Sequence, residues 1–235
     1  MALHHNPRVV TSGLILALDA ADINSYPGSG ATWHDVSGNG NDAGLYNTPT
    51  YQTNNKGVLA FDGTSDLAYT GQNINWSGDF SLGLWVNASR WHDPSSACGG
   101  NNASFLESAN GYWNMWGLEA SSGGPLFFTY YNTSYGGVNM NFGLNSSNLN
   151  QWHYLSVVYR DLGACFTYTD GVQAASATSP GSITTSDILR IGYFSQHCGA
   201  GRPIAQFARI EVYNRALSAT EVEQNYNATK GRFGL

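Results

Sequence analysis

The residues best suited to chemistry in this sequence are its five glutamates. Glycoside cleavage with retention needs two carboxyl groups held about 5–5.5 Å apart. No expected strand carries such a set at alternate positions: Glu107, Glu119 and Glu211 lie far apart, and Glu221 and Glu223 fall on an expected helix. No nucleophile motif of the strand–turn–helix type is present. A Ser-His-Asp arrangement assembled in space stays open, but the sequence predicts a protein that is not an enzyme.

Aromatic side chains beside amide and acid groups form a second pattern, which suits sugar recognition. Ligand pockets combine apolar walls with a few placed polar groups. The candidate residues for a glycan- or partner-binding surface are Trp91, Asp93, Trp113, Trp116, Tyr130, Tyr131, Asn132 and Tyr135. Strand alternation puts Trp113 and Trp116 on opposite faces, one toward the core, and leaves open which is which. The same aromatics would also suit a protein–protein interface.

Oxygen donors recur at alternate positions in one polar loop. Asp35, Asn39 and Asn41 lie there, and Asp62 lies in another polar turn, so these four are candidate calcium ligands. The loop is not an EF-hand, because Tyr46 stands where the bidentate glutamate belongs. The alternative is a set of Asx-rich turns without metal. We expect no required cofactor, and a structural calcium is the candidate ion.

The three cysteines allow two interpretations. Cys98 and Cys198 both lie in Gly-rich stretches, so a disulfide between them is one candidate. Three free thiols, Cys165 included, are the other. Connectivity cannot be read from a sequence, so both stay open.

Composition excludes several classes of protein. The chain has 235 residues, 10 Lys and Arg against 16 Asp and Glu, and only 11% charged residues. With two lysines and a net charge of −6 it is not expected to bind nucleic acid, whose phosphates require clustered cations. Its 31 aromatic residues exclude disorder. No apolar run approaches the roughly 20 residues of a spanning helix, and residues 9–21 read as a first strand, not a secretion signal.

Apart from its C-terminal end, the chain is expected to be β throughout. Strands are predicted at residues 14–18, 58–61, 80–88, 112–118, 126–131, 138–142, 153–159, 165–169, 188–193 and 207–213. Ser218 and Glu221 form a capping box that predicts one helix after them. Trp85 and Trp152 are expected in the core where two sheets meet. We expect an N-terminal arm at 1–12, one all-β domain of two packed antiparallel sheets at 13–228, and a tail at 229–235.

The order of several motifs resembles a known family. The motifs include Trp33-His34-Asp35, Ser37-Gly38-Asn39-Gly40-Asn41, Phe61-Asp62-Gly63-Thr64, Trp152-His153-Tyr154 and Tyr213-Asn214-Arg215-Ala216-Leu217. Together they resemble the laminin-G-like, concanavalin A-like jelly-roll domains over about residues 13–228. Many such domains bind one calcium through loop carboxylates, often with an acid beside the penultimate strand. Residues 205–208 contain no acid, which weakens that expectation here.

Three segments at and near the ends of the chain carry a narrower resemblance. Residues 6–10, 25–30 and 224–234 look like virion proteins of tailed bacteriophages. This resemblance implies a non-enzymatic structural protein on the virion surface, assembled in the host cytoplasm, as a capsid decoration or a tail-fibre domain. Its partners would be other virion proteins or the capsid lattice, host cell-surface glycans, and further copies in a closed homo-oligomer. The alternatives are a free-standing lectin and a polysaccharide-active enzyme.

Overall fold

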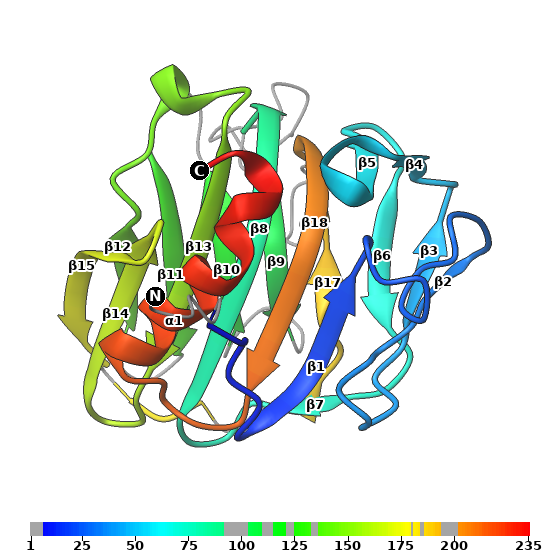
Figure 1. The fold of residues 1–235 in the computed structure, drawn as a ribbon. Coiled ribbons are helices and arrows are strands. Elements are labelled where there is room, and N and C mark those ends of the chain that lie inside the picture. The colour runs from blue at the N-terminus through cyan, green and yellow to red at the C-terminus, as the bar shows by residue number, and fades with distance from the viewer. Residues whose placement is uncertain are drawn as a thin grey trace, which may run out of the picture.

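The computed structural model describes residues 7–91, 103–109, 115–120, 125–132, 136–179, 181–183, 186–193 and 202–235. Within them the chain forms an antiparallel jelly-roll sandwich of two eight-stranded sheets and one short C-terminal α-helix (Figure 1). Both predictions, of a two-sheet all-β fold and of a single C-terminal helix, are confirmed. No helix among these residues is long and apolar enough to cross a membrane.

Sheet A is the front layer of Figure 1. Its strands run in the order β15-β14-β13-β8-β18-β5-β4, and β1 pairs with the second half of β18. Their bounds are β1 Leu14–Asp19, β4 Thr50–Gln52, β5 Val58–Asp62, β8 Phe80–Arg90, β13 Trp152–Tyr159, β14 Ala164–Thr169, β15 Val172–Thr178 and β18 Ile204–Tyr213. The long strands β8 and β18 lie side by side at the centre, so side chains far apart in sequence share one surface.

Sheet B is the rear layer, with the order β12-β11-β10-β9-β17-β6-β3-β2. Its strands are β2 Thr32–Trp33, β3 Ala43–Tyr46, β6 Leu67–Thr70, β9 Ala103–Ala109, β10 Met115–Ala120, β11 Leu126–Asn132, β12 Gly136–Asn141 and β17 Arg190–Ile191. A small ribbon pairs β7 (Ile74–Asn75) with β16 (Ser186–Asp187). Short 3₁₀ turns lie at η1 Asn54–Lys56, η2 Ser146–Asn148 and η3 Lys230–Phe233.

The main core lies between the two sheets. Alternation along β8 sends Phe80, Leu82 and Leu84 inward, as predicted for this strand. The opposite face of β8 is not open to solvent, because Ser81, Gly83 and Trp85 are buried as well. A second apolar cluster covers them on the outer face of sheet A.

The prediction that Trp85 lies between the sheets was wrong. Trp85 faces outward and stacks on Phe233 at 4.1 Å between ring centroids. Its indole nitrogen donates to Thr229 Oγ1 at 2.7 Å. Trp152 is only half-buried and lies 4.6 Å from the same Phe233 ring. Strand periodicity identifies two faces but does not reveal that a C-terminal helix covers the outer one.

That helix, α1 (Ala219–Thr229), begins at the predicted capping box. Ser218 Oγ accepts from the Glu221 backbone N–H at 3.2 Å, and the Glu221 carboxylate accepts from the Ser218 N–H at 2.8 Å. Arg215 donates to the Ser12 carbonyl and also donates to the Glu221 carboxylate with both terminal nitrogens. Hydrogen bonds from Arg215 and Ser218 outweigh burial and hold the pKa of Glu221 at about 2.

Candidate functional site

Most of the predicted aromatic surface that the structure describes lies in the core. Trp116 and Tyr130 are 0% and 1% exposed and pack between the sheets, and Trp91 is 7% exposed. These three are therefore not a glycan-binding surface. Trp116 is the inward member of its segment. Tyr131 and Asn132 lie on β11, but their side chains fall outside the description, as do Asp93, Trp113 and Tyr135 altogether.

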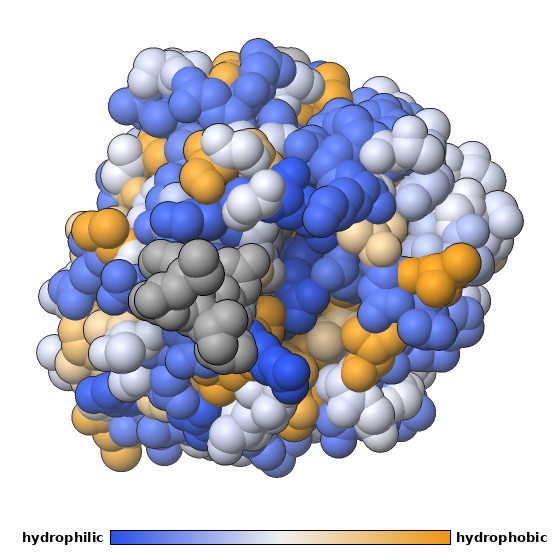
Figure 2. Space-filling view, in the orientation of Figure 1, coloured by the Kyte–Doolittle hydropathy of each residue, from blue (hydrophilic) through white to orange (hydrophobic). Residues whose placement is uncertain are grey.

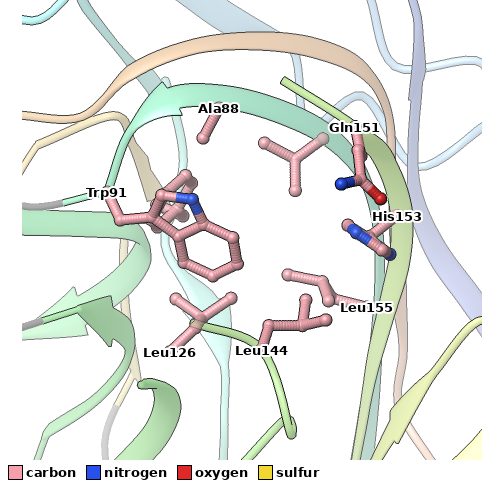
Figure 3. A pocket seen from close by; sticks show the side chains of 9 residues that line it. Ala88, Trp91, Leu126, Leu144, Gln151, His153 and Leu155 are labelled. Carbon is pink, nitrogen blue, oxygen red and sulfur yellow. The ribbon is translucent and has the colours of Figure 1, made fainter. Parts of the chain in front are cut away.

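Trp91 lines a small apolar cavity at one end of the sandwich (Figure 3). Trp91 and Leu126 lie on one side of it, and Gln151, His153 and Leu155 lie on the other. The cavity measures about 10 Å³, close to the smallest space that holds one water molecule. A sugar ring does not fit there.

The predicted calcium ligands Asp35 and Asp62 lie in turns in which their carboxylate oxygens already accept several hydrogen bonds. Asp35 Oδ1 accepts from the backbone N–H groups of Ala17 and Ser37, and Oδ2 accepts from Ser37 Oγ and the Asn41 N–H. Asp62 accepts from Thr64, Ser65 and Asp66 in the same manner. Burial alone raises the pKa of Asp62, but these hydrogen bonds outweigh it and hold that pKa well below its usual range.

These contacts favour the interpretation of Asx-rich turns without metal. No group of three His, Cys, Asp or Glu side chains in the described part of the chain is arranged to hold a metal ion. The candidate disulfide lies outside the described residues, because neither Cys98 nor Cys198 is among them. Cys165 is a buried free thiol.

The loop of Asn39 and Asn41 instead forms one wall of a polar hollow. It lies where β1 begins and β7 crosses, at the lower edge of Figure 1, and encloses about 480 Å³. That volume is within the roughly 300–1,000 Å³ of ligand pockets. We call it the asparagine groove. It is lined by Ile15, Asn39, Asn41, Asn73, Ile74, Asn75, Ser77, Asp79 and Asn214.

Contacts with the backbone hold three of these amides at one end and leave the polar atom at the other end with hydrogen-bonding capacity. Asn39 Nδ2 donates to the Leu14 carbonyl at 3.2 Å, and Asn41 Nδ2 donates to the Ile15 carbonyl at 2.7 Å. Each thereby keeps its Oδ1 as an acceptor. Asn75 is held in the reverse sense, since its Oδ1 accepts from the Ser77 N–H at 2.9 Å and its Nδ2 remains a donor.

The remaining two amides have full hydrogen-bonding capacity. Neither Asn73 nor Asn214 makes a side-chain hydrogen bond within the described ranges. The charged residue in the lining is Asp79, which accepts from the Asp161 N–H at 2.9 Å. The groove therefore presents three amides fixed by the backbone, two amides without a side-chain hydrogen bond in the described ranges, and one carboxylate beside two isoleucines. Sugar hydroxyls, which both donate and accept, match such a surface.

Sequence reasoning found Asn39 and Asn41 but missed the rest of the groove. Asn75 is the second residue of the two-residue strand β7, Asn73 directly precedes that strand, and Asn214 follows β18. Their signal in the sequence is only a local excess of asparagine. The fold brings together three segments that are up to 175 residues apart between Asn39 and Asn214.

A buried carboxyl pair on sheet B was also missed. Glu107 on β9 and Glu119 on β10 are 0% and 5% exposed. Glu107 is opposite Gly117, and a Cβ at position 117 would lie 2.6 Å from Glu119 Oε1, so the glycine gives that carboxyl its place. Burial and then the Glu107 charge raise the pKa of Glu119 to about 8. A carboxyl with a raised pKa suits acid–base chemistry, but Glu107 and Glu119 are both buried, so no substrate reaches them here.

Comparison with known proteins identifies a family by sequence and a group of solved structures with a similar fold. The sequence model of a laminin-G-like family, described as the concanavalin A-like lectin/glucanases superfamily, matches residues 61–223. No curated protein matches the sequence.

Among solved structures, the binding domain of Paraclostridial Mosquitocidal Protein 1 superposes with a TM-score of 0.71 at 16% identity, covering 92% of this chain and 52% of that one. The receptor-binding domain of botulinum neurotoxin type G gives 0.70 at 16% identity, with 92% and 51% covered. A botulinum neurotoxin type C structure, reported with cell entry that depends on two ganglioside molecules, gives 0.71 at 14%, with 94% and 52% covered. The chain spans about half the length of these proteins, and the likeness shows a shared fold.

Proposed function

Because this chain belongs to the laminin-G-like family of the concanavalin A-like lectin/glucanase superfamily, we propose that it is a non-catalytic glycan-binding module. The asparagine groove is its binding site. The observation that carries this proposal is the way Asn39, Asn41 and Asn75 are each tied to backbone at one end. Groups fixed before binding lose little conformational entropy when a ligand arrives.

The similar structures support this ligand class by analogy of fold. One is from botulinum neurotoxin type C, whose cell entry is dependent upon interaction with two ganglioside molecules, and another is a type DC binding domain in complex with SialylT. A further type DC binding domain is in complex with rat synaptotagmin II, a protein. A protein partner is therefore the second type of ligand to test on the same surface.

The wider setting of this function is the surface of a bacteriophage particle. What supports it is the resemblance of residues 6–10, 25–30 and 224–234 to tailed-phage virion proteins. As a capsid decoration or a fibre domain, the module would contact neighbouring virion proteins and assemble as a closed homo-oligomer. Mass spectrometry of purified virions tests this setting, and absence of the protein from every particle fraction would contradict it.

A glycan array tests the binding function. The wild-type protein should retain a defined set of glycans, and the double variant Asn73→Ala/Asn214→Ala should lose at least tenfold in affinity for them. Neither side chain makes a hydrogen bond in the described structure, so folding should be preserved.

Gln173→Ala is the matched control, because Gln173 is an exposed amide on the edge strand β15. Equal loss in the control and in the groove variant would contradict the site. Retention of no glycan by the wild type would contradict the function. A reducing-end assay on the bound polysaccharides should show no release of sugar.

A further inference from the structure

The outer face of sheet A carries an uninterrupted row of side chains across five strands. Trp152 on β13 is opposite Asn87 on β8, and Asn87 is opposite Gln206 on β18. Gln206 is in turn opposite Ala60 on β5, which is opposite Thr50 on β4. Neighbouring strands lie about 4.8 Å apart, so the row is about 19 Å long. We call it the amide row.

A hollow of about 290 Å³ lies along this row. Its lining includes Gln52, Ala60, Asn87, Ser89 and Gln206. Figure 2 shows that hydrophilic residues make up most of this near face, with scattered hydrophobic ones among them. The hollow is small for a compact ligand but long, because it crosses several strands.

The two amides of the row, and Gln52 beside it, have unused hydrogen-bonding capacity. Gln206 Nε2 donates to Gln52 Oε1 at 2.9 Å, which leaves Gln206 Oε1 as an acceptor and Gln52 Nε2 as a donor. The Asn87 side chain makes no hydrogen bond in the described ranges. Ala60, between Gln206 and Thr50, is too short to block the surface. The row therefore has two adjacent amides with free hydrogen-bonding groups, Asn87 and Gln206, followed by open space over Ala60.

One end of the row has an aromatic ring. Trp152 is half-buried, and Phe233 packs against it at 4.6 Å and 36° between ring planes. An indole supported in this way keeps a fixed orientation and offers apolar area beside the polar row. Flat sugar rings combine an apolar face with polar edges, and this arrangement matches both.

The charges in and around the hollow indicate which kind of sugar it binds. None of the lining residues of this hollow is charged. The nearby Arg209 and Arg232 both pair with Asp19, at 2.6 and 2.7 Å, and Arg209 also pairs with Glu211. In this cluster two cations face two carboxylates, so the cluster itself has no net charge to attract an anionic ligand.

We infer that the amide row is a second saccharide site, which binds an extended, uncharged polysaccharide lying across the strands of sheet A. It is separate from the asparagine groove. Asp79 of the groove and Asn87 of the row are eight residues apart along one chain direction, about 26 Å in an extended strand. The two sites are therefore far enough apart to be tested independently by substitution.

Binding to uncharged polysaccharides tests this inference. Affinity electrophoresis in gels containing laminarin, xyloglucan or galactomannan should retard the wild-type protein. Calorimetry with matched oligosaccharides should show affinity that rises with chain length until the row is filled. The double variant Asn87→Ala/Gln206→Ala should lose at least tenfold in affinity, and Gln173→Ala should lose none. Thermal unfolding of each variant shows that the fold is retained.

The groove variant Asn73→Ala/Asn214→Ala separates the two proposals. If it binds polysaccharide like the wild type, the row acts alone, whatever the glycan array shows for the groove. Loss of polysaccharide binding in the groove variant but not in the row variant would overturn the inference. So would affinity that does not depend on chain length, or a wild type that none of the three polysaccharides retards.

Discussion

At the scale of single residues, the absence of a side chain at Gly117 leaves space for the buried carboxyl group of Glu119, whose pKa is raised. Gly117 has no side chain, so Glu119 can fold over the strand toward Glu107 on the neighbouring strand. Burial removes Glu119 from water, and the Glu107 carboxylate adds repulsion, which together raise the pKa of Glu119 to about 8. At neutral pH Glu119 is therefore mostly protonated.

This protonation makes the stability of the protein depend on pH. The ordinary pKa of Glu119 is 4.5, and its pKa in the folded protein is about 8. Between these values the folded protein holds a proton that the unfolded chain has released, so the free energy of unfolding falls as the pH rises. The slope from this group is at most about 1.4 kcal/mol per pH unit. We expect Glu119→Gln to remove it and to leave the variant more stable than the wild type at pH 8 and above.

Urea unfolding of both proteins between pH 5 and pH 9 measures this difference. Glu223→Gln, an exposed glutamate on α1, is the control and should follow the wild-type profile. Parallel profiles for the wild type and Glu119→Gln would show that Glu119 is ionised in the folded protein, contrary to the expectation.

At the scale of elements, the C-terminal helix and turn cover the part of the outer face of sheet A that holds the second apolar cluster. Asn225 of α1 accepts from the Val10 N–H at 2.8 Å and donates to Tyr213 Oη at 3.0 Å. Arg232 of η3 donates to the carbonyls of Asn55 and Gly57. The helix thus joins the start of the chain, β18 and the η1 turn in one polar network over the second apolar cluster.

The start of α1 depends on its cap. Ser218→Ala removes the oxygen that accepts from the Glu221 N–H. We expect a loss of about 1 kcal/mol in the free energy of unfolding, the usual cost of a serine N-cap. Denaturant titration measures it, and Ser218→Asp, which keeps a capping oxygen, should restore most of the stability. An unchanged midpoint for Ser218→Ala would mean that the Arg215–Glu221 pair holds the helix start without the cap.

Substitution of the buried charged residues beneath the helix should reduce the free energy of unfolding more than loss of the Ser218 cap. Glu211 is 1% exposed, and its Oε1 accepts from Arg209 Nε at 2.5 Å. Its Oε2 accepts from Tyr154 Oη at 3.2 Å. Glu211→Gln leaves Arg209 with one carboxylate partner, and the loss of a buried partner costs about 3–5 kcal/mol.

We expect a loss near the lower end of that range, because Asp19 still faces Arg209. Equilibrium unfolding at pH 7 gives the value, again with Glu223→Gln as the reference. A loss below about 1 kcal/mol would show that the network contributes little to stability.

At the scale of the whole molecule, low charge shapes what the protein binds. The chain carries a net charge of −6 with only 11% charged residues, and both proposed saccharide sites are lined almost entirely by uncharged groups. Long-range electrostatic attraction is therefore a small part of binding, and hydrogen bonds with apolar contacts supply the rest.

We accordingly expect affinity for neutral glycans to change less than about twofold between 0.05 and 0.5 M NaCl, because salt screens only charge–charge interactions. Sialylated or sulfated versions of the same glycans should bind more weakly than the neutral ones. Calorimetry at the two salt concentrations checks both points. A tenfold loss at high salt, or a preference for the acidic versions, would mean that cations carry the binding.

The sequence by itself determined the class of fold and most of its long strands. Alternation along residues 80–88 and 207–213, turn pairs such as Asp170-Gly171, and the cap at Ser218 and Glu221 act between near neighbours, so a single chain displays them. The two-residue strands β2, β7 and β16 were not predicted, because so short a segment has no periodicity and forms only by pairing with its neighbour, whereas β17 lies within the predicted strand at 188–193.

Only the tertiary structure decided which faces are covered and which polar residues meet. Trp116 and Tyr130 have the composition of a sugar platform, yet sheet packing buries them, and Trp85 lies under a helix that begins more than 130 residues later. Asn39 and Asn214 share a groove for the same reason. Burial and side-chain assembly depend on contacts between distant segments, and those contacts arise when the two sheets and the C-terminal helix pack together.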